Sequence, residues 1–456
     1  MTTPPEPFPV RPRRRGVLVT VLLAIVALAT LAVPITAQGP GTLARIVGGP
    51  AGRWPGLAQA DASGHRPGAR EFTTGDVADL LDRYADGIRR RDLPAVLTAV
   101  DPTRAALVVA QRRLFANLRQ VGLTTFAYLP VDVVPPRPDP GHPGRYTTGT
   151  ARAWRLMQIR GVDPHPAAQN FQVGLGVRGD HLVIQGLAPV TGPTGNRQPS
   201  PWDANALQVL RSGHVLVAGT ADVAGQLSAV AADAEAAIAD AGPCWPAAWQ
   251  HTFTIFATGD RRAFNTWFRS QFTNTEFIGF EVGLPVVDGS GEVVAGQEAG
   301  IPQVVIDLPR AQRAALGVRK LLEHELTHAA SGTQRNASTE TWAIEGYADF
   351  VAFHNGTLRQ AERGGAAYQK YHSTGGLRVV LPANEDFYGK NAPVNYDLAF
   401  LLFWYLDQRY GQAAVTDFFQ GANRGGDAAA TLQERFHITL AQFLRDWSAW
   451  TFQQLR

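Results

Sequence analysis

The chain has little cysteine, very little lysine and no strong excess of charge of one sign. Its 456 residues contain one cysteine, Cys244, so no disulfide can form within the chain and stability must come from core packing or a metal. A lone cysteine beside Trp245 is typical of a small buried apolar residue. The net charge is +3, and much of it lies in an arginine-rich start. The remainder is near neutral, which gives no indication of a nucleic-acid-binding surface.

An uncharged apolar run, residues 16–37, follows Arg11, Arg13, Arg14 and Arg15. The run is longer than the roughly 7–15 residues of a secretory h-region and reaches the roughly 20 residues of a spanning helix. We therefore expect a single-pass membrane anchor, with residues 1–15 in the cytoplasm and the remainder of the chain outside the cell. The small residues at 35–37 offer an alternative, cleavage and release of a secreted form.

The next part of the chain is predicted to contain a linker and a small domain. Residues 38–70 are rich in Gly, Pro and Ala and indicate a flexible linker. Apolar spacing then predicts helices over 76–91 and from Asp92 toward Val100. Strands are predicted over 126–134, 151–159 and 171–187. This order resembles the NTF2-like (SnoaL-like) cone fold, so residues 71–195 are expected to form an α+β domain with a binding or spacer role.

Residues 196–456 are predicted to form a second domain, after a Pro- and Gly-containing boundary at 189–201. Strands are expected at 214–218, 252–257 and 301–308. Helices are expected at 222–240 and 311–330. Strands first and helices afterwards indicate an α+β lobe followed by a helical lobe, so the fold class is α+β.

The sequence His324-Glu325-Leu326-Thr327-His328 has the spacing of a zinc site. On a helix the two histidines are one turn apart and point the same way, so both imidazoles can bind one ion. Glu325 would face the open coordination position, where a carboxylate can take a proton from bound water. Leu321, Leu322 and Leu326 supply the apolar stripe that would bury such a helix.

A third ligand is available downstream. Residues 331–338 are rich in turn formers and predict a break, and Glu345 and Asp349 lie one turn apart on the helix expected to follow. The Glu345 carboxylate can bind zinc. Asp349 can accept the free ring N–H of a ligand histidine and so fix its tautomer.

The combination H-E-x-x-H and W-x-x-E-G-x-A-x-D resembles the gluzincin type of zinc metallopeptidase, the group that includes thermolysin-like enzymes and the M1 aminopeptidases. The resemblance implies one Zn²⁺ per chain, with His324, His328 and Glu345 as ligands. It implies Glu325 as the general base and Asp349 as the partner of a ligand histidine, His324. It also implies that an edge strand beside the active-site helix, here 301–308, pairs with an extended peptide substrate.

One related group, the metzincins, is excluded, and the specificity of another is not carried over. A metzincin motif would need a glycine and a third histidine where Ser331 and Gln334 stand. The G-x-M-E-N signature of M1 aminopeptidases is absent, so their specificity is not carried over. Two nearby acids, Glu323 and Glu340, are interpreted as solvated helix residues that do not bind the metal.

Peptide hydrolysis also needs a donor aimed at the developing oxyanion. Tyr396 opens an apolar helix that runs to Tyr410, where M1-like enzymes carry a comparable tyrosine. Tyr396 is therefore the candidate, with Tyr388, His354 and His372 as competitors.

The sequence thus predicts a membrane-anchored extracellular zinc metallopeptidase that acts on a peptide or protein. The alternative is a cell-envelope binding or scaffold protein that keeps the fold without turnover.

Overall fold

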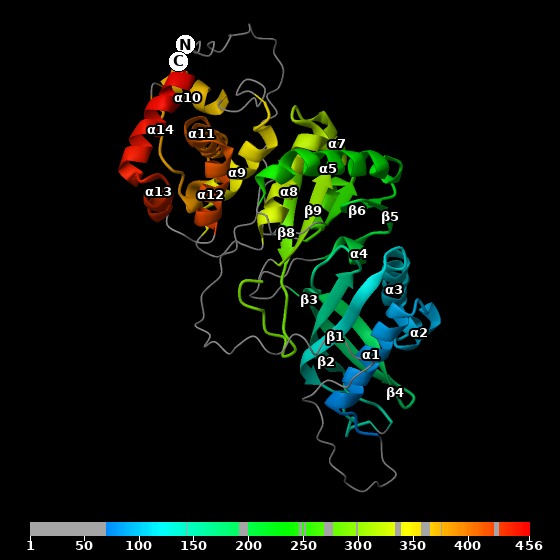
Figure 1. Cartoon of the computed structure of the whole chain (residues 1–456). Helices are drawn as coiled ribbons and strands as arrows, with labels where there is room; N and C mark the ends of the chain where they lie inside the picture. Colours follow the sequence, from blue (N-terminus) through cyan, green and yellow to red (C-terminus); the bar gives the residue numbers. More distant parts are fainter. Residues whose placement is uncertain are drawn as a thin grey trace.

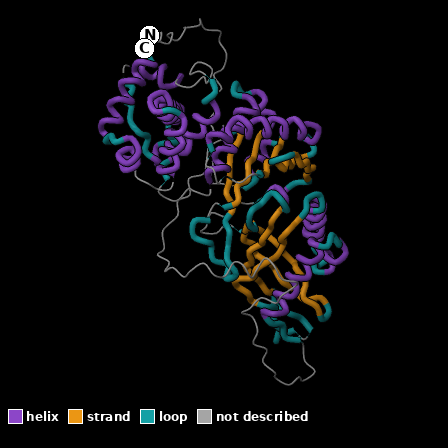
Figure 2. The backbone as a smooth tube through the Cα atoms, in the orientation of Figure 1, coloured by secondary structure: helices purple, strands orange, loops and turns teal. Residues whose placement is uncertain are grey.

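The fold is α+β, as the sequence predicted. A four-stranded antiparallel sheet with its helices comes first, a mixed five-stranded sheet follows, and helices make up the C-terminal part (Figures 1 and 2). Among the described helices, none has both the length and the apolar character needed to cross a membrane. The tail, the apolar run 16–37 and the linker up to residue 69 lie outside the described residues. The computed structural model describes residues 70–142, 144–190, 199–245, 249, 252–268, 277–297, 300–332, 339–356, 365–374, 376–423 and 428–456.

The first region has three helices beside its sheet, whose strands pair in the order β1-β2-β3-β4. Two of them, the first and the third, pack on the sheet, and the second packs on these two helices. The first helix begins at a capping box, in which the Thr73 hydroxyl accepts from the Asp76 N–H and the Asp76 carboxylate accepts from the Thr73 N–H. Its apolar face, including Val77, Leu81 and Tyr84, is buried on the sheet. The elements are α1 (Thr74–Arg89), α2 (Leu93–Thr98), α3 (Ala105–Leu118), β1 (Leu123–Val134), β2 (Gly149–Ile159), β3 (Ala167–Arg178) and β4 (His181–Pro189).

Two features of this region differ from the sequence prediction. The single strand expected over 171–187 is a hairpin of β3 and β4. The chain reverses at Gly179, whose φ of +63° lies in the left-handed region that glycine adopts without strain. The helix α3 was not anticipated, because its valines favour strands as much as helices in isolation.

In the second sheet, strand order places β8 at an edge and β9 in the interior. The order is β5-β6-β7-β9-β8, with β6, β7 and β9 parallel and the two outer strands antiparallel to their neighbours. The strand expected at 301–308 is therefore present as β9, but its expected position at the sheet edge is wrong. The strands are β5 (Leu207–Ser212), β6 (Val215–Thr220), β7 (Phe253–Thr258), β8 (Gly279–Leu284) and β9 (Ile301–Asp307).

The edge strand β8 was not anticipated from the sequence. Three of its six residues, Gly279, Glu281 and Gly283, are poor strand formers, although every residue of the strand is buried. Successive side chains alternate between the two faces of the sheet. Gly279 faces α8 (Gly317–Ser331). Phe280 faces α6 (Arg261–Thr266), where its ring packs edge-on against Phe264 with centroids 5.2 Å apart.

Two helices that pack against each other, α5 (Leu227–Ala241) and α8, cover one face of the five-stranded sheet. The helix α5 packs on β6 and α8, and α8 packs on β8 and β9 (Figure 1). The single helix expected over 311–330 is instead two, α7 (Leu308–Arg313) and α8. They are separated because Ala314 is extended and Gly317 has a φ of +72°.

The remaining helices form the C-terminal part, in which α11 packs against α9. A methyl group at Gly346 of α9 would lie 2.5 Å from the carbonyl oxygen of Ala399 in α11, so only glycine permits this approach. The helices are α9 (Thr341–Phe353), α10 (Gly365–Thr374), α11 (Ala392–Tyr410), α12 (Gln412–Asn423), α13 (Ala428–Phe436) and α14 (Leu440–Gln454).

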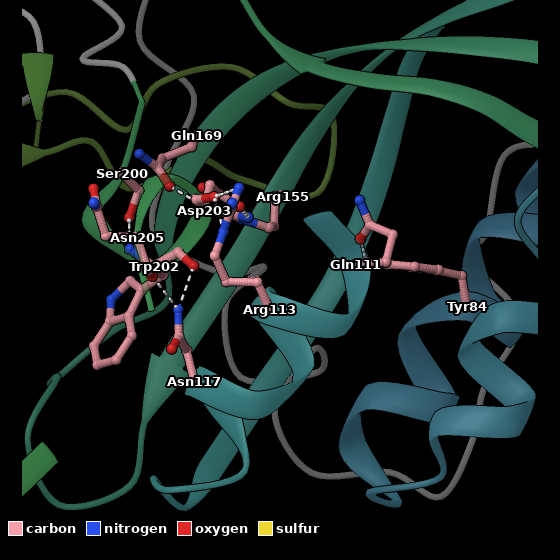
Figure 3. Close-up of polar contacts among 10 residues, drawn as sticks. All are labelled: Tyr84, Gln111, Arg113, Asn117, Arg155, Gln169, Ser200, Trp202, Asp203 and Asn205. Atoms are coloured by element: carbon pink, nitrogen blue, oxygen red, sulfur yellow. Dashed lines mark hydrogen bonds and ion pairs between the residues drawn. The ribbon is translucent and has the colours of Figure 1, made fainter. Parts of the chain in front are cut away.

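A buried ion pair joins the first region to α4 (Pro201–Ala204), the short helix that precedes β5 (Figure 3). Arg155 of β2 is only 1% exposed, and its two terminal nitrogens lie 2.6 and 2.8 Å from the Asp203 carboxylate oxygens. The guanidinium also donates to Gln169 at 2.6 Å and lies over the Phe171 ring. The buried charge is thus matched by a carboxylate, an amide oxygen and an aromatic face.

Side chains of α3 hold the backbone of α4 from the other side (Figure 3). The Asn117 amide donates to the carbonyls of Trp202 and Asn205 at 2.8 Å each, and Arg113 donates to the carbonyl of Asp203. The Trp202 ring packs edge-on against Phe256 of β7 at 5.2 Å. Through α4, the first region is therefore fixed to the five-stranded sheet.

Replacing Asp203 with alanine should be strongly destabilising, because the Arg155 guanidinium would stay buried without its counter-charge. We expect the free energy of unfolding, measured by denaturant titration, to fall by about 3 kcal/mol or more. Asp180→Ala is the control, since the Asp180–His181 pair is 78% exposed on both sides. Equal losses in the two variants would show that the buried pair does not stabilise the junction.

Candidate metal centre

The helix α8 carries His324 and His328 on one buried face. Both side chains are 1% exposed, and their ring centroids lie 4.5 Å apart. Leu321, Leu322 and Leu326 are fully buried beside them, as the apolar stripe predicted. The helix is therefore fixed by apolar packing, with its two imidazoles directed to a common point.

The helix α9 brings Glu345 to that point. Its Oε2 lies 3.4 Å from Nε2 of His324 and 3.8 Å from Nε2 of His328, and the two Nε2 atoms are 2.8 Å apart. Two ligand atoms bound to one zinc at about 2.0–2.1 Å in tetrahedral geometry lie roughly 3.4 Å apart. The three distances bracket that value. Two imidazoles and a carboxylate are also a donor set that zinc accepts, so the group could hold a metal ion.

Asp349 lies one turn after Glu345 and contacts His324. Its Oδ1 is 2.9 Å from Nδ1 of His324, and both side chains are buried. A carboxylate in this place accepts the Nδ1–H and leaves the Nε2 lone pair directed to the group of ligands. The contact is the one that the sequence assigned to Asp349.

The protonation of His324 depends on these carboxylates. Burial lowers the pKa of the imidazole, but hydrogen bonds to Asp349 and Glu345 outweigh burial and raise the pKa to about 10. A metal must displace this proton in order to bind Nε2, so metal binding should release protons at neutral pH.

Glu325 is fully buried on α8 and faces the edge strand β8. A Cβ atom placed on Gly279 would lie 2.9 Å from Oε1 of Glu325 and 2.9 Å from a methyl group of Leu321. Because Gly279 has no side chain, there is space for the Glu325 carboxylate beside β8. This requirement was not apparent from the sequence, because β8 itself was not anticipated.

Among the candidates for the oxyanion donor, Tyr388 contacts a ligand carboxylate. Its hydroxyl donates to Oε1 of Glu345 at 2.8 Å. Tyr396 is buried in the first turns of α11, with its ring 4.9 Å from Phe387 and 6.4 Å from Tyr388. In the sequence analysis Tyr388 was only a competitor. It lies in a loop, so no helical periodicity predicts where its side chain points.

The two competing histidines contact backbone carbonyls elsewhere. His354, at the end of α9, has its Nδ1 2.7 Å from the carbonyl of Val351. His372 of α10 has its Nε2 2.9 Å from the carbonyl of Leu455. Neither is in the group formed by His324, His328 and Glu345.

Glu323 differs from the sequence interpretation. It was expected to be solvated, yet its side chain is fully buried and lies 2.6 Å from the Lys320 ammonium and 3.4 Å from the Arg319 guanidinium. Burial raises the pKa of Glu323, and the two cations offset part of this cost. The packing of α5 against α8, which the sequence does not show, buries this side of the helix. Glu340 is exposed, as expected.

The segment around Cys244 supports both ligand-bearing helices. The Trp245 indole donates to Thr327 of α8 at 2.9 Å, and the Tyr347 hydroxyl of α9 donates to the Cys244 carbonyl. Burial raises the pKa of the Cys244 thiol to about 11. The cysteine is thus an unreactive core residue, as its isolation in the sequence predicted.

The sequence matches no protein-family model, and it has no significant match among curated proteins. The geometry of the buried group is therefore the basis for any functional conclusion.

The pH dependence of stability should reveal the coupling of His324 to its carboxylates. The folded-state pKa of about 10 lies above the ordinary 6.5, so this group stabilises the metal-free fold fully below pH 6.5. The stabilisation is lost as pH rises through 10. We expect the melting temperature of the chelator-treated chain to fall over this range, and to fall less in the Asp349→Asn variant. Equal slopes in the two proteins would contradict the coupling.

Proposed function

We propose that this protein is a zinc-dependent metallopeptidase. One observation carries the proposal: the ligand atoms of His324, His328 and Glu345 converge, with all pairs within 4.8 Å, and the charge of the buried Glu325 acts on His324. Zinc bound there would polarise the scissile carbonyl and lower the pKa of a coordinated water.

The protein's own groups supply the proton transfers. Glu325, one residue after His324 on α8, takes a proton from the attacking water and returns it to the leaving amine. A tyrosine hydroxyl donates to the oxyanion. Tyr396 is the candidate from the sequence, and Tyr388 is the phenol in contact with Glu345.

The substrate is proposed to lie along β8. In gluzincin-like folds an extended peptide pairs with the edge strand beside the active-site helix, and here β8 is the edge strand that packs against α8. Gly279 brings the backbone of this strand close to the Glu325 carboxylate. A peptide paired with β8 would thereby pass next to the proposed general base.

Replacing Gly279 with alanine tests this arrangement. The added methyl group would lie too close to Oε1 of Glu325 and must displace it. We expect unchanged zinc content and a roughly tenfold to hundredfold lower turnover, the usual effect of a misplaced catalytic group. Gly225→Ala is the control, because a Cβ atom there meets only open space. Full activity of Gly279→Ala would place the base elsewhere.

The location proposed from the sequence is the outer face of the cell membrane. The apolar run 16–37 would anchor the chain, and Arg11, Arg13, Arg14 and Arg15 would keep its start in the cytoplasm. The first region then stands between the membrane and the catalytic part as a spacer or binding module.

One observation favours a second candidate function, a cell-envelope binding or scaffold protein without turnover. His324, Glu325, His328 and Glu345 are each no more than 1% exposed. A closed site of this kind would suit a metal that only stabilises the fold. Glu325 argues for the enzyme, because a silent protein has no chemical need for that base.

Replacing Glu325 with glutamine separates the two candidates. If the chain is a peptidase, Glu325→Gln should keep zinc and lose roughly a hundredfold to ten-thousandfold in turnover, because a positioned base is removed. The assay is cleavage of a peptide library by the purified protein, with and without a chelator. Glu340→Gln, at an exposed acid at the start of α9, serves as the control. A fully active Glu325→Gln variant would overturn the mechanism, and absence of chelator-sensitive cleavage in the native protein would favour the scaffold.

A further inference from the structure

The loop before α11 places a phenol against the ligand carboxylate. Tyr388 follows the short 3-10 helix Asn384–Asp386 and is half-buried. Its hydroxyl donates to Oε1 of Glu345 at 2.8 Å. A hydrogen bond to an ionised carboxylate is roughly twice as strong as one between neutral groups.

The two oxygens of Glu345 have different partners. Oε2 faces Nε2 of His324 and Nε2 of His328, at 3.4 and 3.8 Å. Oε1 accepts from Tyr388 instead. The carboxylate therefore presents one oxygen to the metal position, and the other is held by the phenol.

The loop itself is fixed by α11. The Asn395 side chain donates to the carbonyls of Asp386 and Phe387 at 3.1 and 3.0 Å. Phe387 is fully buried, and its ring packs edge-on against that of Tyr388 at 5.2 Å. The phenol is thus positioned by packing as well as by its hydrogen bond.

We propose that Tyr388 is a positioning residue that keeps Glu345 bound to the metal through Oε2 alone. The inference rests on the proposed zinc site. A carboxylate that bound through both oxygens would take a coordination position that a catalytic site leaves for water. Tyr388 does for Glu345 what Asp349 does for His324: each fixes the orientation of one ligand from outside the metal's coordination sphere.

Replacing Tyr388 with phenylalanine removes the hydroxyl and keeps the ring. We expect the dissociation constant for zinc, measured by chelator competition on the full chain, to rise about tenfold to a hundredfold. The visible spectrum of the cobalt(II)-substituted protein should also change, because it reports the number and arrangement of ligands. Tyr405→Phe is the matched control: Tyr405 lies in α11 and packs against Phe443 and Trp450.

A second background tests whether Tyr388 acts through Glu345. In Glu345→Ala, whose zinc affinity should already be reduced, adding Tyr388→Phe should cause no further loss, since the effects of coupled residues are not additive. A full further loss there would overturn the proposal. An unchanged zinc affinity in Tyr388→Phe, with lower turnover, would also overturn it and assign the phenol to the substrate oxyanion. If the native chain binds zinc as described but cleaves no peptide, the proposed peptidase activity fails and the positioning role stands.

Discussion

The burial of charge on α8 and α9 is the constraint on which the rest of this structure depends. Glu325, Glu345 and Asp349 are fully buried, and unpaired carboxylates in such surroundings would be strongly destabilising. The His324 imidazole, hydrogen-bonded to Asp349 and close to Glu345, offsets part of that cost, and a divalent cation would offset far more. The site is therefore stable only if both helices hold their positions. This explains why each is fixed by apolar packing and by a further polar contact to the segment around Cys244.

Much of the metal centre could be predicted because its residues are close in sequence. His324, Glu325 and His328 lie within two turns of one helix, and Glu345 and Asp349 lie one turn apart on the next. Helical geometry alone therefore predicts how the residues of each helix lie relative to one another. Contacts that depend on tertiary packing could not be predicted in this way. Tyr388 reaches Glu345 across 43 positions of sequence, and Gly279 reaches Glu325 from a strand with no clear apolar pattern. Glu323 was misjudged for the same reason, since the helix that buries it is distant in sequence.

The fold was predictable at the level of class and element order, but less so in its connections. The break between α7 and α8 depends on the positive φ of Gly317, which a sequence pattern does not reveal. The junction through α4 was not anticipated, because a four-residue helix has no periodicity to detect. Its stability comes from Arg155 and Asn117, which lie 48 and 85 positions before their partners. Buried polar side chains of this kind specify how two regions meet, whereas the apolar pattern specifies only that each has a core.

The contact between Gly346 and Ala399 limits which substitutions α11 can accept without changing the position of Glu345. The backbones of α9 and α11 meet there, so a larger side chain at either position would move the helix that carries Glu345. The same α11 fixes the loop of Tyr388 through Asn395. A substitution in α11 can therefore displace Glu345 in the neighbouring helix. Among descendants of this chain that keep His324, His328 and Glu345, variation should be lowest where α9 and α11 meet and should rise toward the outer helices.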